Sequence, residues 1–264
     1  MKVFLPIFMI FACTISLVLG NINWQDKVSN ASNIPLETNT KKEPNESTPS
    51  NMELVKYTEN WPKESKNLYK ERLAEGKTFK ILIAGSNSLG GKDYSLPTDL
   101  ADRMKQVYGE TVQVDELIYD LLSSQFVSQD KQQDLIEKNA DLILFEPFTL
   151  KDNGNVAIED SLDNITKIME DVTAANSDTQ FILQPPNPLF DATYYPNKVK
   201  GLKKYAEDNG IPYLDHWSNW PEQDTVEMKE LLYQDPKYPN ISLPNEEGYK
   251  IWSLYLEEFF IKQP

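Results

Sequence analysis

The chain is poor in cysteine and histidine, the residue types that most often bind metals or, for histidine, act in acid–base catalysis. It has one cysteine, Cys13, and one histidine, His216. A single thiol excludes an internal disulfide and a thiolate metal site. No group of histidine, aspartate and glutamate has the spacing of metal ligands, so we expect neither a metal nor another cofactor. Core packing must therefore hold the domain together.

Positive charge is also scarce. The chain has 26 lysine and arginine residues against 41 aspartate and glutamate residues, a formal net charge of −15. Nucleic-acid binding needs a basic stripe to neutralise phosphates, and none is present, so the composition argues against a nucleic-acid partner. An acidic domain is also repelled by an anionic membrane surface, which suits a soluble body held on a tether.

Charged residues are almost absent from residues 1–20, where Lys2 is the only one. Residues 3–19 are nearly all apolar, which is typical of a secretory signal or of an uncleaved membrane anchor. Cleavage before Asn21 and lipidation of Cys13 are the alternative ways of processing it. Each alternative predicts an extracytoplasmic protein of a bacterial cell envelope, linked to the membrane by this segment if it is retained.

Residues 21–60 are rich in asparagine, serine, threonine, lysine, glutamate and proline. They contain too few apolar side chains to offset the entropy of ordering, which predicts a disordered spacer. Strand and helix patterns alternate from residue 61 onward, so residues 61–264 are expected to form one folded domain.

The alternation in this domain predicts a parallel sheet with helical crossovers. Strands are expected at residues 79–84, 112–118, 142–145, 180–184 and 212–214. Helices are expected at residues 62–75, 99–108, 128–138, 158–175, 195–208 and 245–260. Five parallel strands covered on both faces make an α/β fold, a flavodoxin-like three-layer α/β/α sandwich.

The most informative motif is the end of the first strand, where FKILIA runs into Gly85, Ser86, Asn87 and Ser88. Such a turn presents hydroxyl and N–H groups at the carboxyl edge of a parallel sheet, where α/β proteins bind ligands. With the five β/α units and the motif PNEEGYKIW before the closing helix, the domain resembles the SGNH/GDSL hydrolase family over residues 79–260. The resemblance implies a flavodoxin-like fold and hydrolysis or transfer of O-acyl esters by a serine nucleophile.

The chain departs from the family's pattern at its signature positions. The family's nucleophile is the third residue of Gly-Asp-Ser, a place that Asn87 occupies here, so Ser86 or Ser88 can serve only after a one-residue shift. The glycine of the second block is missing from residues 118–121, and the Gly-x-Asn-Asp block is replaced by residues 145–148, with Asn153 the nearest asparagine. Asn240 and Leu243 stand where the acid and base of the last block are expected, and leucine cannot accept a proton.

Glu146 offers another carboxylate. It follows the third strand, which neighbours the first, so it is expected ~5 Å from Ser86 or Ser88. If burial raises its pKa it suits a general base. The alternative is a carboxylate that accepts backbone N–H bonds from a turn. Other polar side chains expected at this edge, as an oxyanion site or polar pocket, are those of Asn87, Asn153, Gln184 and Asn187.

His216 and its neighbours end the fifth strand, three strand spacings or ~14 Å from the first, so the imidazole is expected beyond reach of Ser86. It either holds the loop from Trp217 to Trp220 in place or contacts a ligand. Asp215, Trp217 and Tyr194 combine aromatic faces with a carboxylate, which suits a sugar ring. These aromatic side chains have an alternative role in closing the core beneath long loops.

Two functions of different classes are compatible with these observations. One is an extracytoplasmic hydrolase or acyltransferase acting on esterified glycans of the cell envelope. The other is a catalytically degenerate module that binds an envelope polymer or partner. A structural subunit of an envelope-modifying complex is a third possibility.

Overall fold

The computed structural model describes residues 50–90, 94–234 and 241–263 of the chain, which belong to one compact unit, Pro49–Pro264. The expected signal or anchor, Cys13, and most of the expected spacer lie outside the described residues. None of the helices in the described ranges combines the length and the apolar character needed to span a bilayer.

A parallel sheet forms the centre of the unit. Its strands are β1 (Phe79–Ser86), β2 (Val112–Tyr119), β3 (Leu142–Phe145) and β4 (Gln180–Leu183), in the order β2-β1-β3-β4. Alternate residues of β1 face opposite sides, so Ile81 and Ile83 enter one apolar cluster while Leu82 and Ala84 enter another. A sheet with two buried faces requires the nearly continuous apolar runs that these strands have.

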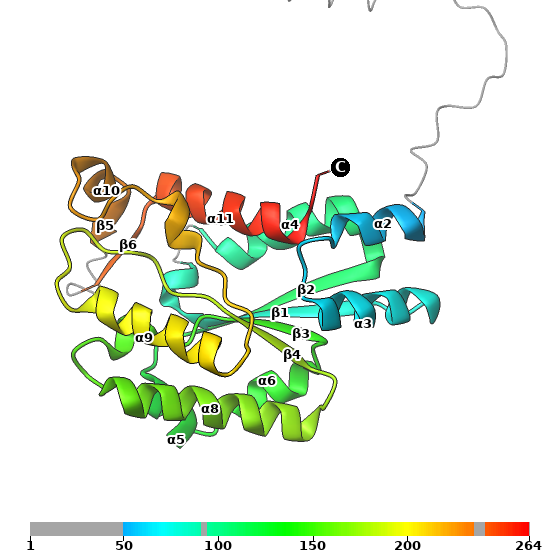
Figure 1. Ribbon diagram of the computed structural model, residues 1–264, viewed down its shortest axis with the longest axis horizontal. Coiled ribbons are helices and arrows are strands. Elements are labelled where there is room, and N and C mark those ends of the chain that lie inside the picture. The colour runs from blue at the N-terminus through cyan, green and yellow to red at the C-terminus, as the bar shows by residue number, and fades with distance from the viewer. Residues whose placement is uncertain (1–49, 91–93, 235–240, 264) are drawn as a thin grey trace, which may run out of the picture. The chain divides into compact units, whose positions relative to one another are not determined.

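Helices cover both faces of the sheet (Figure 1). One layer contains α2 (Asn51–Tyr57), α3 (Lys63–Ala74), α4 (Leu96–Tyr108) and α11 (Glu246–Phe260). The other contains α5 (Ser123–Ser128), α6 (Gln132–Lys138), α8 (Ile158–Ala175) and α9 (Tyr195–Asp208). The predicted three-layer α/β/α sandwich is therefore confirmed.

The predicted number of strands is wrong by one. The main sheet has four strands, and residues 212–214 add only an isolated bridge between Tyr213 and Leu183. Leu183 donates its N–H to Pro212 and accepts one from Leu214, both at 2.8 Å. The ladder stops there because Pro185 and Pro186, which come soon after β4, have no N–H to donate.

The folded unit begins earlier than the spacer prediction allowed. Residues 51–57 form α2, with Ser50 as its N-cap, and Leu54 is buried. The start of the unit is bonded to its end: the Trp61 indole N–H donates to the Phe260 carbonyl at 2.9 Å, and the Lys262 N–H donates to the Tyr57 carbonyl at 2.8 Å. These tertiary contacts order a segment whose composition alone predicts disorder, so the prediction was wrong for residues 50–60.

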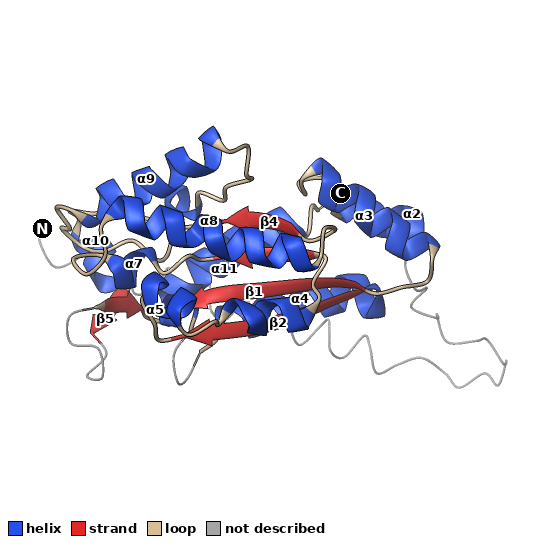
Figure 2. Cartoon of the chain, turned by 90° about the horizontal axis from the view of Figure 1, so that it is seen from below, coloured by secondary structure: helices blue, strands red, loops and turns tan. Residues whose placement is uncertain are grey.

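Short elements lie between the main ones. They are η1 (Asn87–Leu89), η2 (Gly109–Thr111), α7 (Thr149–Asp152), η3 (His216–Asn219), α10 (Val226–Glu230), and the antiparallel pair β5 (Leu232–Gln234) and β6 (Ser242–Pro244). Figure 2 shows the strands of the main sheet pointing toward the end of the unit where β5 lies. That end is the carboxyl edge of the sheet, where the candidate site is found.

Candidate functional site

The turn after β1 is closed by its own side chains. Ser86 ends the strand and caps η1, and its hydroxyl accepts the N–H of Ser88 at 3.2 Å. Ser86 and Ser88 are buried, and Asn87 is only 7% exposed. The two candidate nucleophiles therefore lie within the fold rather than on its surface.

Gly85 allows a carboxylate to approach this turn. Register places Ala84 opposite Phe145, which brings Gly85 beside Glu146 across the β1–β3 pair. A Cβ at position 85 would lie 2.6 Å from the Glu146 carbonyl oxygen and 2.9 Å from its Oε2. Only glycine leaves room for Glu146 at this distance, because any larger residue would displace backbone as well as side chain.

The Glu146 carboxylate is bonded to the Ser86 turn. Its Oε2 accepts the backbone N–H of Ser86 at 2.6 Å, and the side chain is fully buried. Burial raises the pKa of Glu146 to about 8, and the hydroxyl and N–H of Ser86 and the N–H of Phe148 offset part of this effect. Within the described residues, Oε1 has no hydrogen-bond partner. The arrangement combines both readings of the sequence: a turn-binding carboxylate with a pKa near neutrality.

Phe148 bends the chain behind this carboxylate. It adopts a left-handed backbone with φ 61° although its ring is buried, and the ring centroid lies 5.0 Å from that of Phe126. A bulky residue in this region costs about 1–3 kcal/mol, and aromatic packing offsets it. The segment that replaces the family's third block thus has a fixed shape, for which the sequence has no local signal.

Gln184 and Asn187 extend the polar edge beyond Glu146. The Gln184 Oε1 accepts the Trp252 indole N–H at 3.0 Å, which leaves its Nε2 without a partner in the described part of the chain. The Asn187 amide donates to the carbonyls of Pro188 and Ser242 at 3.0 and 3.1 Å, which leaves its Oδ1 unpartnered there. Because each amide has a bonded end, its free end is identified without ambiguity.

Four buried polar atoms without a described partner therefore belong to residues at or shortly after the ends of three neighbouring strands. They are Asn87 Nδ2, Glu146 Oε1, Gln184 Nε2 and Asn187 Oδ1. The Gln184 N–H donates to the Phe145 carbonyl at 3.0 Å, which joins the ends of β3 and β4. The Tyr195 hydroxyl donates to the Asn187 carbonyl at 3.0 Å, and its pKa is raised by burial and by the nearby Glu146 charge. We call the four unpartnered atoms of Asn87, Glu146, Gln184 and Asn187 the edge set.

Asn153 does not belong to the edge set. It ends α7, where its N–H donates to the Leu150 carbonyl at 3.3 Å, and it is only half-buried. Neighbouring Asp152 is fully buried, and its carboxylate accepts the N–H of Ser123 at 2.9 Å and the hydroxyl of Ser161. The expected oxyanion role of Asn153 has no geometric support in this arrangement.

His216 is fully buried and both of its nitrogens are used. Trp220 donates its indole N–H to Nδ1 at 3.1 Å, so Nε2 carries the proton and donates to the Pro185 carbonyl at 2.9 Å. The ring stacks on Trp252 at 4.1 Å, and burial lowers the pKa of His216 to about 3. The expectation of a ligand contact is wrong, and the alternative holds: a neutral imidazole fixes the loop that follows the bridge residue Tyr213.

The aromatic residues at this edge divide into buried and exposed ones. The half-buried Trp217 donates its indole N–H to the Pro186 carbonyl at 2.7 Å and packs on Tyr195, while Asp215 pairs with Lys203 at 2.8 Å. These contacts give Trp217 and Asp215 structural roles, and their predicted contact with a sugar stays a prediction. Tyr194 is 78% exposed and remains available. Phe190, 37% exposed, is an additional exposed ring that was not predicted from the sequence.

The end of the chain places a leucine where the family's base is expected. Leu243 lies in β6 and is 1% exposed. Asn245 then caps α11 by accepting the Gly248 N–H at 3.1 Å. The PNEEGYKIW motif therefore builds a helix start, and its neighbour Leu243 contributes apolar surface.

Comparisons with solved structures identify the fold. A putative GDSL-like lipase from Parabacteroides merdae matches with a TM-score of 0.56 at 12% identity, over 70% of this chain and 96% of that one. The fold is SGNH/GDSL hydrolase-like. A catalytic mutant of an acetylxylan esterase from Geobacillus stearothermophilus has a TM-score of 0.54 at 12% identity, covering 70% and 97% of the two chains. A lipase/acylhydrolase from Enterococcus faecalis has a TM-score of 0.52 at 17% identity, covering 71% and 100%. No protein-family model and no curated protein match the sequence.

Within this SGNH/GDSL hydrolase-like fold, the carboxyl edge lacks an imidazole that could activate a serine, since the only histidine of the chain is committed elsewhere. Across the described residues, no group of three or more histidine, cysteine, aspartate or glutamate side chains is placed to hold a metal ion. What the edge does offer is hydrogen-bonding capacity in the edge set.

Proposed function

We propose that this protein is a non-hydrolytic SGNH-fold module that binds a hydroxyl- and acyl-bearing glycan of the cell envelope at the carboxyl edge of its sheet. The observation that carries the proposal is the edge set, four buried polar atoms without a described partner, in residues at or shortly after the ends of three adjacent strands. Buried polar groups are normally satisfied, so such a cluster marks a place for ligand or ordered water.

The chemistry of the edge set suits a neutral polar ligand. Asn87 and Gln184 supply N–H donors, and Asn187 supplies a carbonyl acceptor. Glu146, with its pKa near 8, is mostly protonated at pH 7 and donates a proton rather than repelling an oxygen. Alternating donors and acceptors match hydroxyl and acyl oxygens better than a charged group.

The glycan and the extracytoplasmic location are supported by the sequence. The apolar segment 3–19 is typical of export, and the resemblance to ester-cleaving enzymes points to acylated carbohydrate as the ligand class. Tyr194 and Phe190 supply exposed rings at the same edge, on which sugar C–H faces can stack.

A binding measurement tests the proposal. The affinity of the full chain for acetylated and for deacetylated xylo-oligosaccharide would be measured by calorimetric titration. Asn87→Ala removes one donor and is expected to weaken binding by about 2- to 12-fold, the value of one net hydrogen bond. Asn197→Ala, the same substitution at an exposed position of α9, is the matched control and should leave the affinity unchanged.

If neither oligosaccharide binds, or if both asparagine variants bind as the wild type does, the edge set is filled by water alone and the proposal fails. A chromogenic short-chain ester is assayed in parallel. The proposal requires that the wild type and a Ser86→Ala, Ser88→Ala double variant share the same background rate.

The position of Glu146 favours a second candidate, a Ser–Glu esterase. A carboxylate with a pKa of about 8 and an unoccupied Oε1, in the range that the structure describes, lies against the Ser86 turn, and a base with a pKa near the working pH is effective. Glu146→Gln keeps the shape of the side chain and removes the base. A wild-type esterase rate that this variant abolishes would replace the binding proposal with the enzymatic one.

A further inference from the structure

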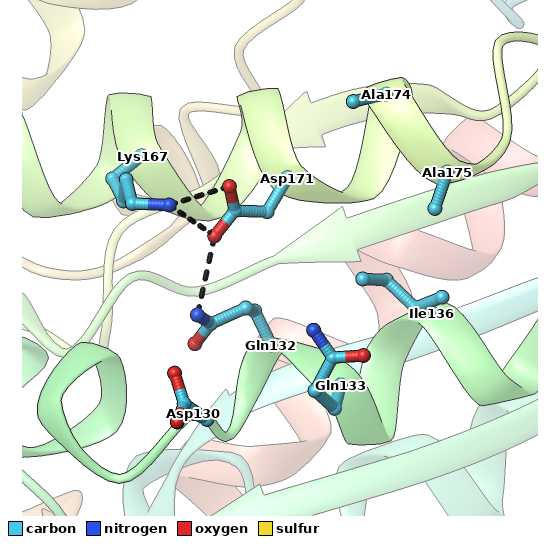
Figure 3. A pocket seen from close by; sticks show the side chains of 8 residues that line it. All are labelled: Asp130, Gln132, Gln133, Ile136, Lys167, Asp171, Ala174 and Ala175. Carbon is cyan, nitrogen blue, oxygen red and sulfur yellow. Dashed lines mark hydrogen bonds and ion pairs between the residues drawn. The ribbon is translucent and has the colours of Figure 1, made fainter.

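A second polar site lies on the face of the unit covered by α6 and α8, formed by residues other than the edge set. A groove of about 520 Å3 runs between these helices. Figure 3 shows Lys167 and Asp171 on α8 opposite Gln132 on α6, with Asp130 just before α6 and Ile136 facing Ala175. The groove thus has a polar end and an apolar end.

At the polar end of the groove, Gln132 has a hydrogen-bond acceptor without a described donor. It is only 4% exposed, and its Nε2 donates to the Asp171 Oδ2 at 3.1 Å. That bond fixes the amide so that Oε1 is the other end, and over the described residues this buried oxygen has no donor. A buried carbonyl oxygen without a donor is unfavourable, so the groove is suited to a group that brings an N–H or O–H.

The charges around Gln132 indicate what kind of hydrogen-bond donor a ligand of the groove should carry. The Lys167 ammonium contacts both carboxylate oxygens of Asp171, at 2.5 and 2.6 Å, so that carboxylate is already neutralised. Asp130 is exposed, has a left-handed backbone with φ 52°, and shows no ion pair within the described ranges. One unneutralised carboxylate therefore stands beside one unpartnered carbonyl oxygen, and a cation with several N–H groups satisfies both.

We propose that the α6–α8 groove binds a guanidinium or ammonium group on an alkyl stem. The cation bonds to the Gln132 carbonyl and the Asp130 carboxylate, and the stem lies along Ile136, Ala174 and Ala175. The net charge of −15 attracts such a ligand over long range. This chemistry is shared by a basic side chain of a partner polypeptide and by a free polyamine.

The test is a nuclear magnetic resonance titration of the full, 15N-labelled chain. The probes are n-butylguanidinium and n-butylurea, which have similar shapes and differ in charge. The cation is expected to shift the Gln132 side-chain amide and the backbone amides of α6 and α8, and the urea is expected to bind at least fivefold more weakly. Raising the salt concentration should weaken the binding of the cation and leave the binding of the urea unchanged.

Asp130→Asn is the decisive variant, because asparagine tolerates the left-handed backbone and only the charge is removed. One exposed charge pair corresponds to about fivefold in affinity, which is the weakening expected for n-butylguanidinium. Asp191→Asn is the matched control, since Asp191 is also an exposed aspartate with a left-handed backbone, at φ 49°. It should bind the cation as the wild type does.

Equal binding of the cation and the urea, an unchanged affinity in Asp130→Asn, or shifts confined to the carboxyl edge would overturn the assignment. A short arginine peptide and spermidine are then compared with the same readout. Tighter binding of the peptide assigns the groove to a protein partner, and tighter binding of spermidine assigns it to a free amine. Since these probes do not involve the edge set, the result is independent of the glycan proposal.

Discussion

Replacing Glu146 by glutamine should remove one contribution to the pH dependence of the stability of this protein, in one defined pH window. In the native state the carboxyl has a pKa of about 8 because it is buried, whereas its ordinary value is 4.5. Between these values the native state holds a proton that the unfolded state has released. Stability therefore falls as pH rises from 4.5 to 8, by up to about 5 kcal/mol for this group.

The glutamine side chain has nearly the same shape, can accept the Ser86 N–H, and does not titrate. The wild type and Glu146→Gln should thus be about equally stable at pH 4.5, and the variant should gain progressively up to pH 8. Urea denaturation followed by tryptophan fluorescence at several pH values measures the difference, in which other titrating groups cancel. Glu258→Gln, at an exposed position of α11, is the control and should show no such trend. A constant difference between wild type and Glu146→Gln would refute the buried, raised-pKa carboxyl.

Two further predictions concern the same edge. Gly85→Ala should destabilise the protein by about 2–4 kcal/mol in urea denaturation, because the added methyl group overlaps the Glu146 backbone and loosens its bond to Ser86; wild-type stability would mean that β1 and β3 separate freely. The single imidazole should show no titration of its proton resonances between pH 8 and pH 4.5, since its native pKa is about 3, but should titrate near pH 6.5 in urea. Native titration near 6.5 would place His216 in solvent.

Much of the fold could be predicted because local patterns are strong where the core is continuous. The apolar run of β3 and the helical periodicity of α8 gave bounds identical to those observed, Leu142–Phe145 and Ile158–Ala175. The expected helix at residues 128–138 begins only at Gln132, as α6, and the preceding helix α5 was not expected; Asp130, with its left-handed backbone, separates the two. A single backbone angle of this kind has no periodic signature.

The candidate site was predicted less completely, because its chemistry depends on contacts between distant residues. The sequence places Gln184 and Asn187 at the carboxyl edge, but their free ends are defined by Trp252 and Ser242, 68 and 55 residues away. The pKa of His216 is likewise lowered by burial, in a position where its ring accepts a bond from Trp220 and stacks on Trp252. Whether a residue is held in the fold or keeps a free hydrogen-bonding group thus depends on partners far away in the sequence. A local sequence pattern does not identify these partners.

The pairing of Tyr57 with Lys262 and of Trp61 with Phe260 has a practical consequence for handling the protein. Both ends of the compact unit meet beside Phe79, where Trp61 packs at 5.4 Å, which is the amino end of β1. The eight residues of this strand separate that point from Ser86 by roughly 25 Å. Immobilising the protein on a sensor chip through the end of the compact unit that follows Lys262 should therefore leave the carboxyl edge open to soluble analytes.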